Sequence, residues 1–332
     1  MSLSLGFFLR LLFFPGLTFI LLLSMLCDWI ERKIKARMQN RMGPAYTGPA
    51  GILQPIADFI KLLAKEDIVP YGAKTLLFRI FPLIAFSIFT LALLLIPIDG
   101  EKVISGLRFE GDLLLILALM LIANFFLFIS GWSSSNPFSV IGATRVLMQL
   151  VGYDTSLFLL ALNPALLAGS LNIEKIANSQ MLPFILISPW SFLLFLITLQ
   201  AELEKDPFDI PCAETEIVAG YETEYSGMRL AFIMAAKDLQ TLLGAALIVE
   251  LFLGGANGPV IAGPQYVWHT LWFTLKVIIT VLLMEYLTCV FARFRIDQVV
   301  RLNWRLLVPS SLISLILTAI IKLLFLGVAA SW

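Results

Sequence analysis

The chain has 332 residues, of which 59% are hydrophobic and only 14% are charged, and its 23 basic side chains balance its 23 acidic ones. This composition excludes an ordinary soluble domain, because one globular core cannot bury so much apolar surface. A net charge of zero also gives no electrostatic basis for binding nucleic acid. The long continuous apolar runs exclude a transmembrane barrel, whose strands alternate in polarity over about 10 residues. The composition therefore predicts an all-α polytopic membrane protein.

Eight apolar segments approach the length of about 20 residues that a helix needs to cross a bilayer. They fall near residues 4–27, 76–97, 112–131, 147–170, 182–201, 230–253, 266–289 and 306–328. The first is interpreted as an uncleaved span, because its apolar run is longer than that of a signal peptide and lacks a small-residue cleavage site. We therefore expect a single integral membrane domain over residues 1–332, with about eight transmembrane helices.

The connections between these segments differ in charge. Most of the Lys and Arg residues outside the spans lie in the connections 28–75, 132–146, 202–229 and 290–305. Basic residues are enriched in cytoplasmic loops, so these four connections are predicted to be cytoplasmic and both termini to lie outside the cell membrane.

The first connection contains the stretch ILQPIADFIKLLAKE, whose apolar residues recur at helical spacing. This pattern predicts an amphipathic helix on the cytoplasmic surface of the membrane, in contact with lipid. It is compatible with a plain surface anchor as well as with a functional role.

The third cytoplasmic connection is unusually acidic for so apolar a chain. Residues 201–227 read AELEKDPFDIPCAETEIVAGYETEYSG, in which Lys205 is the only base. Further ionisable residues interrupt the apolar segments themselves: Asp154, Glu202, Lys237, Asp238, Glu250, Lys276 and Glu285. Each is costly at bilayer depth unless it is paired or hydrated. Pairing between helices can explain some of them, but so many together favour a line of titratable groups that carries protons or ions.

Other chemistry finds little support. The cysteines Cys27, Cys212 and Cys289 are isolated and there is one histidine, His269, so this chain is expected to bind no metal, haem or iron–sulfur cluster. No phosphate-binding loop or zinc-protease motif is present, and no catalytic nucleophile stands out.

Three blocks in the same order resemble the H subunit of bacterial complex I, which is equivalent to subunit 1 of mitochondrial NADH dehydrogenase. They are ERKIKARMQNRMGPAYTGPAGILQPIADFIKLLAKE (31–66), GWSSSNPFSVIGATRVLMQLVGYD (131–154) and AELEKDPFDIPCAETEIVAGYETEYSGM (201–228). The resemblance implies a subunit that anchors a peripheral redox arm, walls the cavity of the terminal acceptor and carries an acidic path into the membrane.

The resemblance also implies roles for particular residues. The cavity and the junction with the peripheral arm would involve Glu31, Arg32, Arg37, Arg41, Asp58, Lys61, Glu66, Asp206 and Asp209. The ion-coupling path would involve Asp154, Glu202, Glu214, Glu216, Glu224, Lys237 and Asp238.

The chain departs from the quinone-linked pattern at several acidic positions. Cys212 stands where a Glu is usual, Lys237 falls at another Glu position, and Asp154 replaces a third Glu. These changes favour the membrane-anchor subunit of ferredoxin-driven [NiFe] hydrogenases or of archaeal sulfane-sulfur reductases. Its partners would be a hydrogenase-like large subunit, a small iron–sulfur subunit and antiporter-like membrane subunits, and the iron–sulfur clusters and any [NiFe] centre would lie in those partners.

Two alternatives stay open. One is the quinone-site subunit of a complex I-like quinone oxidoreductase fed by NADH, ferredoxin or F420H2. The other is a stand-alone secondary transporter, which is disfavoured because the sequence has no evident internal repeat. The sequence does not distinguish H⁺ from Na⁺ as the coupling ion.

Overall fold

The computed structural model describes residues 5–100, 110–260 and 263–326, and within these ranges every regular element is a helix. The longer helices are α2 (Leu17–Met38), α4 (Thr75–Leu94), α5 (Asp112–Trp132), α6 (Pro137–Ala168), α9 (Pro189–Glu202), α11 (Gly227–Phe252), α12 (Gln265–Val290) and α14 (Val308–Ile321). The shorter ones are α1 (Leu5–Leu12), η1 (Pro49–Gly51), α3 (Gln54–Ala64), α7 (Ile173–Asn178), α8 (Phe184–Ile187), α10 (Glu214–Ile217), η2 (Gly220–Glu222), α13 (Ile296–Leu302), η3 (Asn303–Leu307) and η4 (Lys322–Leu326). This confirms the predicted all-α membrane protein.

Seven helical stretches in the described part of the chain are long and apolar enough to cross a membrane. The expected span near 182–201 instead forms the short helix α8 followed by the 14-residue helix α9. Pro189 opens α9 and has no N–H to continue the hydrogen bonds of α8. A helix of 14 residues is about 21 Å long, shorter than the bilayer core, but α9 packs on α6 and α14 and is largely buried within the protein.

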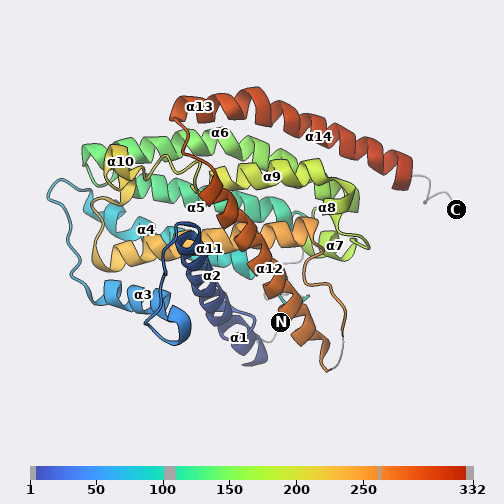
Figure 1. The fold of residues 1–332 in the computed structure, drawn as a ribbon, viewed down its shortest axis with the longest axis horizontal. Helices are drawn as coiled ribbons and strands as arrows, with labels where there is room; N and C mark the ends of the chain where they lie inside the picture. Colours follow the sequence, from blue (N-terminus) through green and yellow to red (C-terminus); the bar gives the residue numbers. More distant parts are fainter. Residues whose placement is uncertain (1–4, 101–109, 261–262, 327–332) are drawn as a thin grey trace.

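The long helices form a layer around α11 (Figure 1). α4, α5, α6 and α11 lie side by side along the long axis of the molecule, while α2 and α12 cross them diagonally. From Leu239 to Phe252 every residue of α11 is buried. α11 is therefore the central helix, and it contacts α2, α3, α4, α7 and α12.

The predicted amphipathic helix is present as α3, which packs against α2 and α11. Ile60 and Leu63 on its outer face are 59% and 42% exposed, whereas Pro55 on its inner face is buried. The helix α2 is longer than expected, because it continues from the apolar segment into the connection 28–75. Its last turns therefore hold Asp28, Glu31 and Arg32 on a rigid helix and not on a loop.

The acidic connection after α9 folds back against α5 and α6 through η2. Its tight path depends on Gly220, which has a φ of +56°. A Cβ at this position would lie 1.8 Å from the Pro211 carbonyl oxygen. Glycine is the residue that adopts this conformation without steric cost.

We predict that Gly220→Ala destabilises the acidic connection. The left-handed backbone alone costs an alanine about 1–2 kcal/mol, and the clash with Pro211 adds to this. The measurement is the thermal inactivation temperature of the detergent-solubilised assembly, which we expect to fall. Gly72→Ala is the matched control, since its Cβ would meet only the Ser135 Cβ at 3.6 Å. Equal effects of the two substitutions would contradict this role for Gly220.

Candidate functional site

Charged side chains from three elements meet at one end of the helix layer. A cavity of about 240 Å³ lies between the end of α2, the start of the acidic connection and α12. Its lining is mostly charged: Asp28, Glu31, Arg32, Lys35, Glu204, Lys205, Asp206, Asp209, Glu285 and Thr288. We call these residues the charged cavity.

Lys205 is the centre of the charged cavity. Its Nζ lies 2.7 Å from Glu31 Oε1 on α2 and 3.6 Å from Glu285 Oε2 on α12, and its side chain is only 13% exposed. Burial acts to lower the pKa of Lys205, but the two carboxylates outweigh it and raise the pKa. Lys205 therefore stays charged and ties the acidic connection to both helices.

A second ionic group joins α2 to α3. Arg32 donates from Nε to Asp28 at 2.9 Å and from Nη1 to Asp58 at 2.6 Å, while Gln54 donates to the other oxygen of Asp58 at 2.8 Å. Arg32 and Asp58 are both predicted to line the cavity mouth, and the structure brings them together. Asp28 is the third member of this group. It lies four residues before Arg32 on α2, so the two side chains lie on the same face of the helix and form an ion pair.

Beside this group lies a smaller cavity of about 80 Å³ between α2, α3 and α11. Its walls are mainly apolar, with Leu21, Met25, Phe59 and Leu62 among them, and one end is charged. That end carries Asp28, Arg32, Asp58 and Asp238. We call this smaller cavity the amphiphilic cavity. It brings the predicted path residue Asp238 next to the predicted junction residues Arg32 and Asp58.

From the charged cavity, acidic groups continue inward. Glu204 accepts a hydrogen bond from the Tyr221 hydroxyl at 3.1 Å. Burial raises the pKa of Glu204 to about 7, although the nearby Lys237 and the Tyr221 hydrogen bond act to lower it. Glu204 is thus able to change its charge near neutral pH.

The next two acids form a buried pair. Glu202 at the end of α9 is 5% exposed and Asp154 on α6 is 7% exposed. Their side chains are hydrogen-bonded to one another, and Asn124 on α5 donates to Glu202 Oε1 at 2.6 Å. Two carboxyl groups can share a hydrogen bond only when one of them carries a proton. The Asp154–Glu202 pair is therefore placed to share a proton inside the helix layer.

The residues that depart from the family pattern also lie together. Lys237 forms an ion pair with Glu222, its Nζ is 3.3 Å from Cys212 Sγ, and it lies 4.8 Å above the Tyr221 ring. Burial raises the pKa of the Cys212 thiol, which therefore stays neutral. The positive charge of Lys237 is thus compensated by Glu222, an acid of the same connection.

Several predicted residues lie outside this series of contacts. Glu216 pairs with Arg145 at 2.7 Å and its side chain is 53% exposed, Glu224 accepts a hydrogen bond from Asn136, and Asp209 pairs with Arg293 at 2.5 Å. Asp206 lies at the rim of the charged cavity, where burial raises its pKa. The exposed members of the predicted junction are Arg37, Arg41, Lys61 and Glu66. Glu214 begins α10, and its side chain lies outside the part of the chain that the structure describes.

Several members of the site are not predicted from the sequence. Glu204, Lys205, Glu222 and Glu285 stand out there only as charges without an assigned role, and Asp28 does not stand out. Asn124 and Gln240 are missed altogether, although each is an amide in an apolar segment; Gln240 donates to the Glu202 carbonyl at 2.8 Å. A polar side chain in such a segment is the signal that could have identified them.

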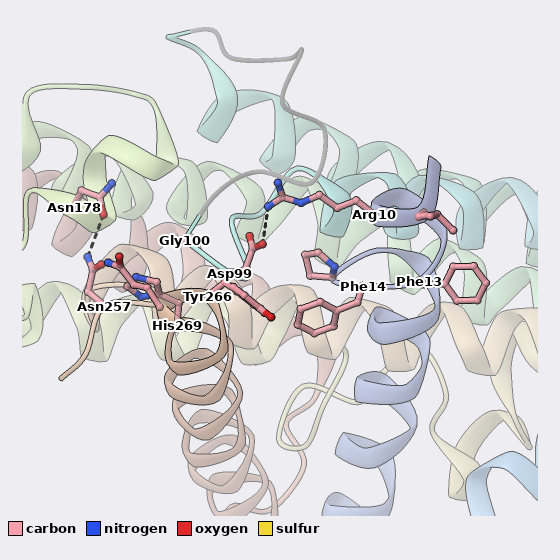
Figure 2. Close-up of a pocket in the computed structure, with 12 residues that line it drawn as sticks. Arg10, Phe13, Phe14, Asp99, Gly100, Asn178, Asn257, Tyr266 and His269 are labelled. Carbon is pink, nitrogen blue, oxygen red and sulfur yellow. Dashed lines mark hydrogen bonds and ion pairs between the residues drawn. The ribbon is translucent and has the colours of Figure 1, made fainter. Parts of the chain in front are cut away.

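A larger cavity lies elsewhere (Figure 2). It measures about 1060 Å³ and is lined by residues from α1, the start of α12 and the segments after α4 and α11. Arg10 pairs with Asp99 at 2.6 Å beside it, and His269 Nδ1 lies 3.0 Å from the Ala256 carbonyl. None of the predicted junction or path residues lines this cavity. Among the residues that the structure describes, no group of three or more His, Cys, Asp or Glu is placed to hold a metal ion.

Comparisons with known proteins find relatives along most of the chain. A family model described as NADH dehydrogenase matches residues 12–319. The H subunit of NADH-quinone oxidoreductase from Thermomicrobium roseum is 39% identical over 317 residues, which covers 90% of this chain and 91% of that protein. The same subunit from Dehalococcoides mccartyi is 38% identical, covering 91% and 83%. The one from Bacillus cereus is also 38% identical, covering 89% and 88%.

Removing the central cation is predicted to destabilise the site. Lys205→Met leaves Glu31 and Glu285 facing one another without their shared partner, and loss of one member of a buried ionic group costs about 3–5 kcal/mol. The double substitution Lys205→Met with Glu285→Gln should recover part of this loss. Both are measured as thermal stability of the solubilised assembly. A double variant no more stable than the single one would contradict the electrostatic explanation.

The raised pKa of Glu204 predicts a pH dependence. Below about pH 7 the carboxyl is protonated and above it the carboxylate forms, so an activity that depends on the charge of Glu204 should change across pH 7. Glu204→Gln fixes a neutral group and should abolish this transition. The measurement is ion transport by the assembly in proteoliposomes between about pH 5.5 and about 8.5, a window that brackets the Glu204 pKa. Glu216→Gln on the exposed α10 is the control. A transition near pH 7 that persists in Glu204→Gln would assign it to another group.

Proposed function

Because this chain belongs to the NADH dehydrogenase family, together with the H subunits of bacterial NADH-quinone oxidoreductases, we propose that it anchors a peripheral redox arm and couples electron transfer to ion translocation. It is a multi-pass membrane subunit of a complex I-like oxidoreductase assembly. In this proposal the chain holds no redox centre, and its partners supply the iron–sulfur clusters.

The single observation that carries the proposal is the series of charged groups running inward from the two cavities. It begins at Asp28, Arg32 and Asp58, continues through Lys205 and Glu204, and ends at the proton-sharing pair. Such a series has a use in coupling, because a change of charge at one end alters the protonation of the next group. If the Asp154–Glu202 pair had a purely structural role, it would need no series of charged groups leading to the cavities.

Electrostatics gives the size of this effect. Two unit charges roughly 8 Å apart at an effective dielectric constant of about 20 interact by about 2 kcal/mol. This corresponds to a shift of about 1.5 pKa units in the neighbouring group. Reduction of a terminal acceptor consumes protons at the charged or amphiphilic cavity. In this proposal the resulting change shifts the protonation of Glu204, and then of Glu202 and Asp154, and neighbouring antiporter-like subunits move the ions.

The first candidate for the acceptor is a quinone. The chemistry of the amphiphilic cavity supports it, because its apolar walls match a quinone ring while Arg32, Asp58 and Asp238 match the polar oxygens. Its volume of about 80 Å³ is below the roughly 300–1,000 Å³ of a ligand pocket, so the cavity would have to widen to admit the ring. The similar proteins are named NADH-quinone oxidoreductases, which points the same way.

The second candidate is a ferredoxin-driven [NiFe] hydrogenase or a sulfane-sulfur reductase, in which the redox chemistry takes place wholly in the partners. Cys212 and Lys237, which replace acids of the quinone-linked pattern, favour it. Their weight is reduced by the Lys237–Glu222 pair, since the local charge is balanced within this chain. A stand-alone transporter is the weakest candidate, and transport of a solute by the purified chain alone would be needed to support it.

The same proposal covers topology and partners. Both termini would lie outside the cell membrane, and the peripheral arm would dock on the exposed charges Arg37, Arg41, Lys61 and Glu66. The coupling ion would be H⁺ or Na⁺.

Purification of the intact assembly through a tag on this chain tests the proposal. Mass spectrometry should identify soluble iron–sulfur subunits and antiporter-like subunits. Extracted quinone together with quinone reduction would select the first candidate, and H₂ formation or sulfane-sulfur reduction from reduced ferredoxin the second. The number of ions moved per electron should fall severalfold in Glu202→Gln and Asp154→Asn, with electron transfer retained. Recovery of the chain without redox partners, or full coupling in both variants, would contradict the proposal.

A further inference from the structure

The C-terminal helix changes its winding beside the buried acid pair. Between α13 and α14, residues Asn303–Leu307 form the π-helical segment η3. Such a segment contains one more residue per turn than an α-helix and is often found at functional sites. Asn303, its first residue, is 0% exposed, whereas Arg301 and Arg305 on either side are exposed.

Asn303 binds α6 through both ends of its side-chain amide. Its Nδ2 donates to the Gly152 carbonyl, and its Oδ1 accepts from the Ser156 hydroxyl at 2.7 Å. One turn earlier, the Tyr153 hydroxyl donates to the Val299 carbonyl of α13 at 3.2 Å. These three bonds fasten one turn of α6, residues 152–156, to the C-terminal helix.

Asp154 lies in the middle of that turn and on its opposite side. Gly152 and Ser156 are each two residues from Asp154, which is about 200° around the helix, so they share one face while Asp154 occupies the other. Asp154 meets Glu202 of α9 on its own face. The bonds to Asn303 therefore fix this turn of α6 on the face opposite to Asp154.

A small rotation of this turn of α6 would separate the two acids. Side-chain ends lie about 6 Å from a helix axis, so a rotation of about 10° moves them by about 1 Å. A shift of that size is enough to break a hydrogen bond between two carboxyl groups. We propose that Asn303 is a positioning residue that keeps Asp154 within hydrogen-bonding reach of Glu202. This inference rests on the proposed role of that pair in the ion path.

A purely structural role for Asn303 would make it one of several equivalent contacts between α6 and α14. Such contacts exist farther along: Thr318 donates to Asn163 at 2.7 Å, and Lys322 donates to the Leu166 carbonyl at 2.6 Å. They keep α14 on α6 without Asn303. Thr318→Val is therefore a matched control that removes a buried hydroxyl contact between the same two helices, away from Asp154.

The test uses the intact assembly in membrane vesicles and measures ions moved per electron as a function of pH. Glu202 is the titratable group that faces Asp154, and Glu204 acts on Glu202 in turn. Asn303→Leu keeps the branched shape of the side chain and removes both bonds. We expect a two- to tenfold lower coupling ratio and a pH midpoint displaced by about one unit, because the two acids then titrate separately. Thr318→Val should leave both unchanged.

If Asn303→Leu fails to assemble, Ser156→Ala replaces it in the test, because it removes one of the two bonds and leaves Asn303 in place. We expect it to displace the pH midpoint in the same direction by a smaller amount. An unchanged pH profile in the variant that assembles, or an equal displacement in Thr318→Val, would overturn the positioning role. Asp154→Asn separates the two proposals. If it uncouples transport while Asn303→Leu does not, only the positioning role fails; if Asp154→Asn stays fully coupled, the proposed ion path itself fails.

Discussion

A charge can be buried in a membrane protein only when an opposite charge or a shared proton replaces the hydration it has lost. The charged cavity satisfies that constraint with Lys205, which lies between Glu31 of α2 and Glu285 of α12. This one ammonium group joins the acidic connection to the extended end of α2 and to α12. The smaller ionic group around Arg32 then fixes α3 against the same end of α2.

Deeper in the helix layer, Glu202 and Asp154 are hydrogen-bonded to one another, and a shared proton does there what the Lys205 ammonium does at the surface. This difference separates the two halves of the site. The outer half is held by ion pairs that keep their charges, whereas the inner half depends on a proton that can leave. Glu204 connects them, since burial raises its pKa to about 7. In the proposed mechanism, a change of charge at the cavities reaches the inner pair through Glu204, a group that responds near neutral pH.

The sequence predicted the fold well because continuous apolar runs leave a helix as the only way to satisfy the backbone in a bilayer. It predicted α3 from the spacing of Ile56, Phe59, Ile60 and Leu63. It did not predict the break between α8 and α9, because the apolar run continues across Pro189, where the second helix begins. Nor did it predict that α2 carries Asp28 and Glu31 beyond the apolar segment, since charged residues at the end of an apolar run are also typical of the start of a loop.

The kind of site was predicted better than the residues that form it. Asp154, Glu202, Lys237 and Asp238 stood out as charges in apolar segments, whereas the position of Asp238 beside Arg32 and Asp58 follows from the fold. Partners that are polar but uncharged, such as Asn124, Gln240 and Asn303, gave no such signal. Lys237 shows why single positions mislead: its charge reverses the expected one, yet Glu222 compensates for it.

Infrared difference spectroscopy of the intact assembly tests the central claim most directly. Electron flow should change the band of a protonated carboxyl group, the band should shift in heavy water, and it should be lost in Glu202→Gln. A band that is unaffected by electron flow, or that persists unchanged in both Glu202→Gln and Asp154→Asn, would contradict the account.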